Sequence, residues 1–284
     1  MAERSLARLH VFLARDASIG LVLRRGPSKY VCAIGWNRDT DEFQVGQWLK
    51  GRIYEENSDL SSNGRYFIYA AMQKGRRHTA VSQVPYLTAL VFSVEVGNCG
   101  SGGAFTSDHT YWIRHAILAD WIRAADVLPS GSGMERDLGD HSQDSFFRSS
   151  ALLPRDGWTF VPWDQTAGLG GFRCCAQETR LGWRLERVDG PSAVLKPYLD
   201  HQIKFALHNP ETGGQQVFSD WSWAAWDRHR LVWATAGQLW AGTVGESGLT
   251  DARCLHDFNA MAFEKMVAPY EGVPHKEPFS DEGW

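Results

Sequence analysis

A chain of 284 residues with 43% hydrophobic residues can bury one large core or two small ones, which excludes a disordered protein. Its 33 acidic residues outnumber 29 Lys and Arg, so the formal net charge is −4. Nucleic-acid binding depends on clustered cations that release phosphate counterions, and we therefore expect no nucleic-acid partner. The one basic run, residues 74–78 (KGRRH), is interpreted as a solvated hairpin loop because loop tips collect charge.

The N-terminal segment interrupts its own apolar run with charges. Leu9 to Ala14 is followed at once by Arg15 and Asp16, before a signal-peptide core or a membrane span is complete. We therefore expect a cytoplasmic protein with no membrane partner. The five cysteines are odd in number and lack C-x-x-C spacing, and the ten histidines are scattered. No disulfide framework, metal site or other cofactor is predicted.

Three segments of the chain share one pattern, a polar tight turn followed by an aromatic and β-branched run. They are residues 59–69, 104–113 and 225–233, and each reads as a hairpin that enters an inner strand. Leu60 and Phe105 hold matching positions 45 residues apart, which is the period of a propeller blade at about 40 to 50 residues. Trp226 follows Phe105 by 121 residues, which leaves room for two or three more blades. The spacing predicts an all-β fold, a β-propeller of five four-stranded blades, with six as the alternative.

Strand patterns fill most of the remaining chain. In chain order they cover residues 10–14, 19–25, 29–36, 42–49, 53–61, 66–72 and 79–94, then 158–163, 173–176, 181–187, 193–199, 203–208, 221–226, 230–234 and 238–244. Pro85 splits residues 79–94 and suits an edge strand because it cannot donate to a ladder. Residues 10–14 show no local hairpin mate, so we expect them to close the ring by pairing with the blade of residues 221–244.

One helix and two irregular segments interrupt this pattern. Ile117, Trp121, Ala124 and Leu128 have helical spacing and predict a helix over residues 115–128. The polar residues 130–150 then predict a long surface loop. We expect a single propeller domain over residues 1–267 with a helix and loop insertion at 115–150, followed by an extended proline-containing tail at 268–284.

The segment Asp59-Leu60-Ser61-Ser62-Asn63-Gly64-Arg65-Tyr66 resembles the strand entry of bacterial TolB-type propeller repeats, which carry Ser-Pro-Asp-Gly. Ser62 and Asn63 stand where that pattern has Pro and Asp, and Asn-Gly makes the same turn. The Trp-Asp dipeptides at 163–164 and 226–227 are similar to those of WD40 proteins, although the second precedes its strand. The resemblance covers about a third of the chain and implies a fold with no activity attached.

Two functions remain open on this fold. The first is a non-enzymatic protein-binding module or scaffold subunit of a bacterial-type intracellular complex, because tryptophan is favoured at binding hot spots. Its predicted partner-binding residues are Trp121, Arg123, Trp158, Trp163 and Trp284. The alternative is a carbohydrate-active propeller, a glycoside hydrolase or lectin, that uses Trp side chains with Asp59, Asp108, Asp220 and Asp227. Aspartates at such positions are also ordinary turn formers, so no catalytic residue is assigned.

Overall fold

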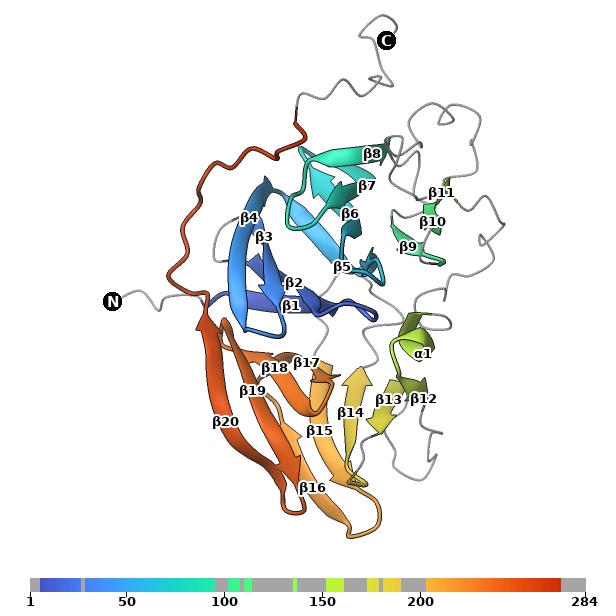
Figure 1. Cartoon of the computed structure of the whole chain (residues 1–284), viewed down its shortest axis with the longest axis vertical. Helices are drawn as coiled ribbons and strands as arrows, with labels where there is room; N and C mark the ends of the chain where they lie inside the picture. The colour runs from blue at the N-terminus through green and yellow to red at the C-terminus, as the bar shows by residue number, and fades with distance from the viewer. Residues whose placement is uncertain are drawn as a thin grey trace, which may run out of the picture. The chain divides into compact units, whose positions relative to one another are not determined.

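The computed structural model describes residues 6–26, 29–94, 102–107, 110–113, 135–136, 152–160, 173–178, 181–189 and 203–271. Strands form nearly all of the regular structure in these ranges, and the only helix there is the three-residue α1 (Leu153–Arg155) (Figure 1). None of the described helical structure is long and apolar enough to cross a membrane. The expected all-β fold is confirmed, and the helix predicted over 115–128 lies outside the described residues.

Twenty strands form five sheets within these ranges, and each sheet is built from strands that are consecutive in the chain. Sheet A holds β1 (Arg8–Leu13), β2 (Ile19–Arg25), β3 (Tyr30–Asn37) and β4 (Glu42–Lys50), and sheet B holds β5 (Arg52–Leu60), β6 (Tyr66–Gln73), β7 (Arg76–Gln83) and β8 (Ala89–Val94). Sheet C holds β9 (Gly103–Phe105), β10 (Thr110–Ile113) and β11 (Glu135–Arg136), and β10 pairs with β11 in parallel. Sheet D holds β12 (Thr159–Phe160), β13 (Arg173–Glu178), β14 (Arg184–Asp189), β15 (Ile203–Asn209) and β16 (Gly214–Phe218), and sheet E holds β17 (Trp221–Asp227), β18 (Arg230–Thr235), β19 (Gln238–Gly245) and β20 (Gly248–Asp257).

The chain divides into two compact units. Unit I comprises Val11–Arg148 and Met261–Trp284, and unit II comprises Met1–His10 and Ser149–Ala260. Sheets B and C and nearly all of sheet A belong to unit I, whereas sheets D and E belong to unit II. The C-terminal residues are therefore part of unit I, although the strands that precede them belong to unit II.

Unit I has two hydrophobic cores, one on each face of sheet B. Successive side chains of a strand point to opposite faces, so Phe67 and Tyr69 pack with residues of sheet A while Ile68 packs with residues of sheet C. Strand β6 is consequently buried over most of its length. Burial of each such large apolar side chain contributes about 1.5 to 3 kcal/mol, which makes sheet B the centre of this unit.

The hairpin between β5 and β6 shows why the repeated turn pattern has its composition. Gly64 has a φ of +71°, and a Cβ there would lie 2.7 Å from the Cβ of Ile19. The Ser61 hydroxyl accepts a hydrogen bond from the Tyr66 N–H at 2.9 Å. The antiparallel pairs β5–β6, β9–β10 and β17–β18 confirm the three predicted hairpins.

Unit II is built around tryptophan. A stack of four aromatic rings runs through Phe218, Trp221, Trp233 and Trp240, with centroid separations of 3.8, 4.9 and 6.3 Å. Trp221 and Trp233 belong to the core that joins sheets D and E. Flat rings with large area suit the space between two sheets, and this accounts for part of the high tryptophan content.

The expected pairing of the first strand is wrong. Residues 10–14 do not pair with residues 221–244, because β1 is the neighbour of β2 in sheet A. The Ala14 N–H donates to the Ile19 carbonyl at 2.9 Å, so a tight connection supplies the local mate that the sequence pattern did not reveal. The predicted split of residues 79–94 at Pro85 is confirmed, because Pro85 lies in the connection between β7 and the edge strand β8.

Candidate functional site

Of the five predicted partner-binding residues, only one lies in the described part of the chain. Trp158 is 7% exposed and belongs to the core of unit II. The other four, Trp121, Arg123, Trp163 and Trp284, lie outside the described residues, so their role stays a prediction. The partner-binding role of Trp158 likewise stays a prediction.

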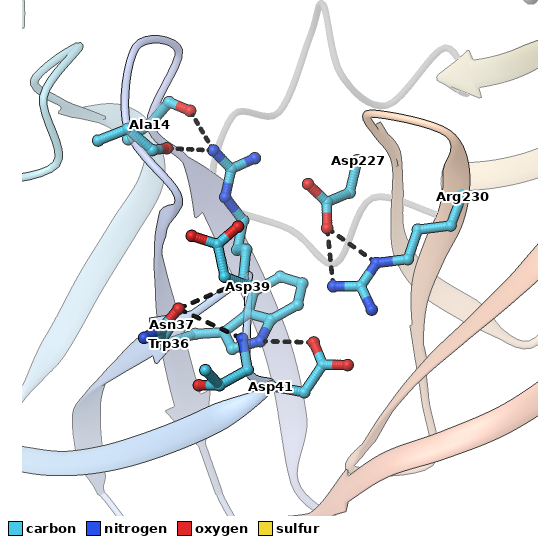
Figure 2. A network of polar contacts seen from close by, with 10 residues as sticks. Ala14, Trp36, Asn37, Asp39, Asp41, Asp227 and Arg230 are labelled. Atoms are coloured by element: carbon cyan, nitrogen blue, oxygen red, sulfur yellow. Dashed lines mark hydrogen bonds and ion pairs between the residues drawn. The ribbon is translucent and has the colours of Figure 1, made fainter.

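The described aspartates of the carbohydrate-active alternative are occupied by contacts within the protein. Asp59 accepts from the backbone N–H groups of Leu60 and Phe105 at 2.9 and 2.8 Å. Asp227 is 1% exposed, and its Oδ2 receives two N–H groups of Arg230 at 3.0 and 2.9 Å (Figure 2). Asp220 accepts from the Thr235 hydroxyl at 2.9 Å. These carboxylates have structural roles, and Asp108 lies outside the described residues.

A similar structural network surrounds the turn between β3 and β4. The Trp36 indole N–H donates to Asp41 at 3.3 Å, and the Asp39 N–H donates to the side chain of Asn37 at 3.0 Å (Figure 2). The Arg38 guanidinium donates to the carbonyl of Ala14 at 2.7 Å and also to that of Ala17. These bonds fix the loops of sheet A.

The most distinctive feature of unit I is its C-terminal segment, residues 261–271, which we call the strap. It contains no strand, and its contacts run from sheet A to sheet B (Figure 1). At its start, the Arg24 guanidinium donates to the Met261 carbonyl at 3.3 Å. Arg24 is 2% exposed, and it lies in one cross-strand row with Cys32 and Trp48. Sheet A thus presents a buried cation to the strap backbone.

An aromatic contact holds the next part of the strap. The Phe263 ring lies 4.8 Å from that of Tyr30 and 6.1 Å from that of Trp48, centroid to centroid. The Arg24 guanidinium lies 5.6 Å from the Trp48 ring, a cation–π distance. Phe263 nevertheless remains 53% exposed, so only one part of its ring is used against sheet A.

Gln47 joins three segments of unit I with one side chain. Its Nε2 donates to the Met266 carbonyl of the strap at 3.1 Å. Its Oε1 accepts from the backbone N–H groups of Leu87 and Thr88, both at 2.7 Å, and from the Thr88 hydroxyl at 3.0 Å. Gln47 is 7% exposed, and a buried amide with both ends satisfied fixes the strap to the loop before β8.

Tyr270 anchors the end of the strap on sheet B. Its hydroxyl donates to the Thr88 carbonyl at 2.8 Å and accepts from the Gln83 N–H at 3.2 Å. The ring of Tyr86 meets it edge-on at 6.0 Å. Burial raises the pKa of Tyr270 to about 12, so this phenol keeps its proton and its donor role at neutral pH.

Thiol and metal chemistry find no support at this site. Burial raises the pKa of the Cys32 thiol to about 12, although the nearby Arg24 acts in the opposite direction. A thiol that stays protonated is a poor nucleophile. Within the described ranges no group of three or more His, Cys, Asp and Glu side chains is placed to hold a metal ion. Burial lowers the pKa of His78, whose ring packs against those of Tyr69 and Phe92, and this favours the neutral imidazole.

The arrangement has two capabilities. Two side chains of sheet A, Arg24 and Gln47, hold an extended peptide through its backbone carbonyls, and the Tyr270 hydroxyl of that peptide bonds the backbone of Gln83 and Thr88. The strap also presents apolar side chains outward, since Phe263 is 53% and Val267 60% exposed. Val45 on β4 is 39% exposed. Three of the four exposed large hydrophobic side chains described in unit I therefore lie on the strap or on β4, the other being Ile19.

Sequence reasoning did not find this site. Arg24 within the apolar run of β2 was an available signal, because a buried arginine needs a partner. Gln47 and Met266 carry no pattern that links them, and 219 residues separate them in the chain.

No protein-family model matches the sequence, and no curated protein matches it significantly. Among solved structures, the β-propeller domain of Myceliophteria thermophila Cps50 (Swd1) has 10% identity and a TM-score of 0.32, covering 89% of this chain and 87% of that one. An uncharacterized protein of Listeria monocytogenes EGD-e has 8% identity and a TM-score of 0.31, covering 91% and 85%. The GH43 protein BlXynB of Bacillus licheniformis has 11% identity and a TM-score of 0.28, covering 84% of this chain and 49% of that one. TM-scores this low carry no argument about the function of this chain.

Proposed function

We propose that the five sheets are blades of a propeller and that the chain is a non-enzymatic protein-binding module, a scaffold or regulatory subunit of an intracellular complex. The strap is the observation that carries the proposal. An extended peptide already lies on unit I, held by Arg24 and Gln47 through its backbone, and it displays Phe263 and Val267 outward. A partner that covers these side chains would bury apolar area on a rigid support.

The choice of a protein over a sugar follows from the chemistry of the outward surface. Phe263 is accompanied by the aliphatic Val267 and Val45, and aliphatic groups offer no stacking face to a sugar ring. The described carboxylates Asp59, Asp220 and Asp227 are engaged within the protein. No specific observation in the described residues favours the carbohydrate-active alternative.

Two double variants test the proposal. Phe263→Ser with Val267→Ser removes the outward apolar groups of the strap, and Leu181→Ser with Val217→Ser removes apolar groups of equal exposure from unit II, at 53% and 62%. A partner captured from the native host by cross-linking is identified, purified and titrated against each protein. We expect the strap variant to bind at least about tenfold more weakly, as for loss of a hot spot, and the control to bind normally.

Two outcomes would contradict the proposed protein-binding function or its interface. Equal binding by the two double variants would remove the strap from the interface. Turnover in a glycosidase panel, or selective binding on a glycan array, together with no stoichiometric protein partner, would replace the module by the carbohydrate-active function.

A further inference from the structure

Four cations gather at one end of sheet B, and Lys50, the last residue of β4 in sheet A, precedes them by one glycine, although the chain as a whole has a net charge of −4. Lys50 and Arg52 flank the connection from β4 to β5, and Lys74, Arg76 and Arg77 form the turn from β6 to β7 and the start of β7. Four of these side chains are exposed and Arg77 is half-buried. We call this set the basic end of sheet B. It is wider than the basic run of the sequence, because it joins residues from two separate connections.

The backbone brings the two connections together at a glycine. A Cβ on Gly51 would lie 2.4 Å from the Met72 carbonyl oxygen, so only glycine allows this approach. Met72 pairs with Arg52 on one side and with Arg77 on the other. The three residues form one cross-strand row, and side chains of one row share a face of the sheet.

A tyrosine fixes the two guanidinium groups of this row. The Arg52 guanidinium carbon lies 4.9 Å from the centroid of the Tyr54 ring, and that of Arg77 lies 5.6 Å from it. The Tyr54 hydroxyl points to the Met72 sulfur at 3.9 Å. A guanidinium that stacks on a ring leaves the N–H donors along its edge available, and two of them can donate to one oxyanion in a bidentate contact.

The nearby acidic groups balance only part of this charge. Glu55 forms an ion pair with Arg25 at 3.7 Å, and Glu56 is the next residue. In the described ranges, Lys50, Arg52, Lys74 and Arg76 have no carboxylate within 4.0 Å. Among the described residues, these five cations outnumber the two carboxylates, and a positive surface attracts an anionic ligand.

We propose that the basic end of sheet B binds an acidic segment of the protein partner, a peptide rich in Asp and Glu. The site rests on the proposed protein-binding function and gives the partner its chemistry. Arg52, stacked on Tyr54, takes a carboxylate in a bidentate contact, and Lys50, Lys74, Arg76 and Arg77 add positive charge. A nucleic acid is the less suitable occupant, because a single turn and one connection offer few phosphate contacts on a chain of net negative charge.

Fluorescence anisotropy with the wild-type protein tests the site. The probe is a fluorescein-labelled peptide of alternating glutamate and serine, and the matched probe replaces each glutamate by glutamine. The variant Arg52→Gln with Arg76→Gln removes two of the five cations of the basic end. The control Arg65→Gln with Arg253→Gln removes two exposed arginines elsewhere. Arg65 lies at the opposite end of sheet B and also stacks on a tyrosine, with its guanidinium carbon 5.3 Å from the centroid of the Tyr66 ring.

We expect the wild type and the control to bind the acidic peptide, and the basic-end variant to bind it about tenfold more weakly with an unchanged melting temperature. Arg52→Lys keeps the charge and loses the planar fork, so it should also weaken binding. Equal binding of the glutamine peptide, an equal loss in the control, or equally tight binding of single-stranded DNA of the same length would each overturn the proposal.

The protein-binding function can fail or stand independently. If the basic-end variant binds the purified partner as well as the wild type does, the acidic-segment site is wrong and the strap interface stands. If no partner exists and only the acidic peptide binds, the site stands as an anion site and the module is wrong.

Discussion

Asp59 at the end of β5 accepts a hydrogen bond from the backbone N–H of Phe105 in β9, at 2.8 Å between Oδ2 and N. The two residues are 46 positions apart and belong to neighbouring sheets, B and C. Asp59 is 4% exposed, and its second oxygen accepts from the Leu60 N–H. One buried carboxylate therefore ties the entry of one repeat to the same point of the next.

Replacement of this carboxylate should be costly. Asp59→Ala leaves the Phe105 N–H without its acceptor in a buried position, and we expect a loss of about 2 to 4 kcal/mol in the free energy of unfolding. Urea denaturation followed by tryptophan fluorescence measures it. Asp220→Ala, at an exposed position, serves as the control and should change stability by less than about 0.5 kcal/mol. A similar small change for Asp59→Ala would show that the bond does not hold the sheets together.

The sequence predicted the repeated part of the fold because its signals are local. Turn residues such as Gly64 and the continuous run of large apolar side chains in β6 depend only on neighbours in the chain, and these hairpins are present as expected. Strand β20 escaped prediction because most of its side chains are exposed, so it has no apolar period to detect. The pairing of residues 10–14 was predicted wrongly because the turn that joins β1 to β2 lacks an Asn-Gly or Asp-Gly signal.

The candidate site could not be predicted from the sequence for a different reason. The contact of Gln47 with Met266 joins positions 219 residues apart through a side chain and a backbone carbonyl. Any residue offers a carbonyl, so the strap sequence carries no mark of this contact. The basic end of sheet B could not be predicted for the same reason. Arg52 and Arg77 come close to one Tyr54 ring only because Gly51 lets its strand approach the Met72 carbonyl.

A single substitution at Gln47 should release the strap. Gln47→Glu keeps an oxygen for Leu87 and Thr88 but places a second carboxylate oxygen against the Met266 carbonyl, which repels it. We expect trypsin to cleave after Lys265 several-fold faster in this variant, because a released strap fits a protease more readily. Gln44→Glu adds the same charge at an exposed position of β4 and should leave cleavage unchanged. Equal rates in all three proteins would contradict the role of Gln47.

Tyr270 should give the protein a stability loss at alkaline pH. Its pKa rises from the ordinary 10.0 to about 12 on folding, so above pH 10 the unfolded chain releases a proton that the folded protein retains. The free energy of unfolding is therefore constant in this respect below pH 10 and falls between pH 10 and about 12. Burial also raises the pKa of Tyr69, and Tyr69 is present in wild type and variant alike.

The comparison of wild type with Tyr270→Phe isolates this group. The variant loses the hydrogen bonds to Thr88 and Gln83, so we expect it to be about 1 to 2 kcal/mol less stable at pH 8. Its stability should fall less steeply than that of the wild type between pH 10 and 12, as measured by urea midpoints. Parallel curves would show that the Tyr270 hydroxyl is exposed to solvent in the folded protein.

The two described free cysteines should differ sharply in reactivity. Cys254 on β20 is exposed, whereas Cys32 on β3 is fully buried, and burial raises its pKa to about 12. Alkylation requires both access and a thiolate, so iodoacetamide at pH 8 should modify Cys254 in the native protein and Cys32 only after unfolding in urea. Peptide mass spectrometry reads each site separately, and Cys254→Ser removes the fast site as a control.

Cys32 lies in one row with Arg24 and Trp48 on the face of sheet A that contacts the strap. The Gln47→Glu variant therefore provides a second measurement. If that variant opens the strap, the reaction of Cys32 should quicken while that of Cys254 stays the same. Rapid native labelling of Cys32 in the wild type would show that this face of the sheet is open to solvent and that the strap does not seal it.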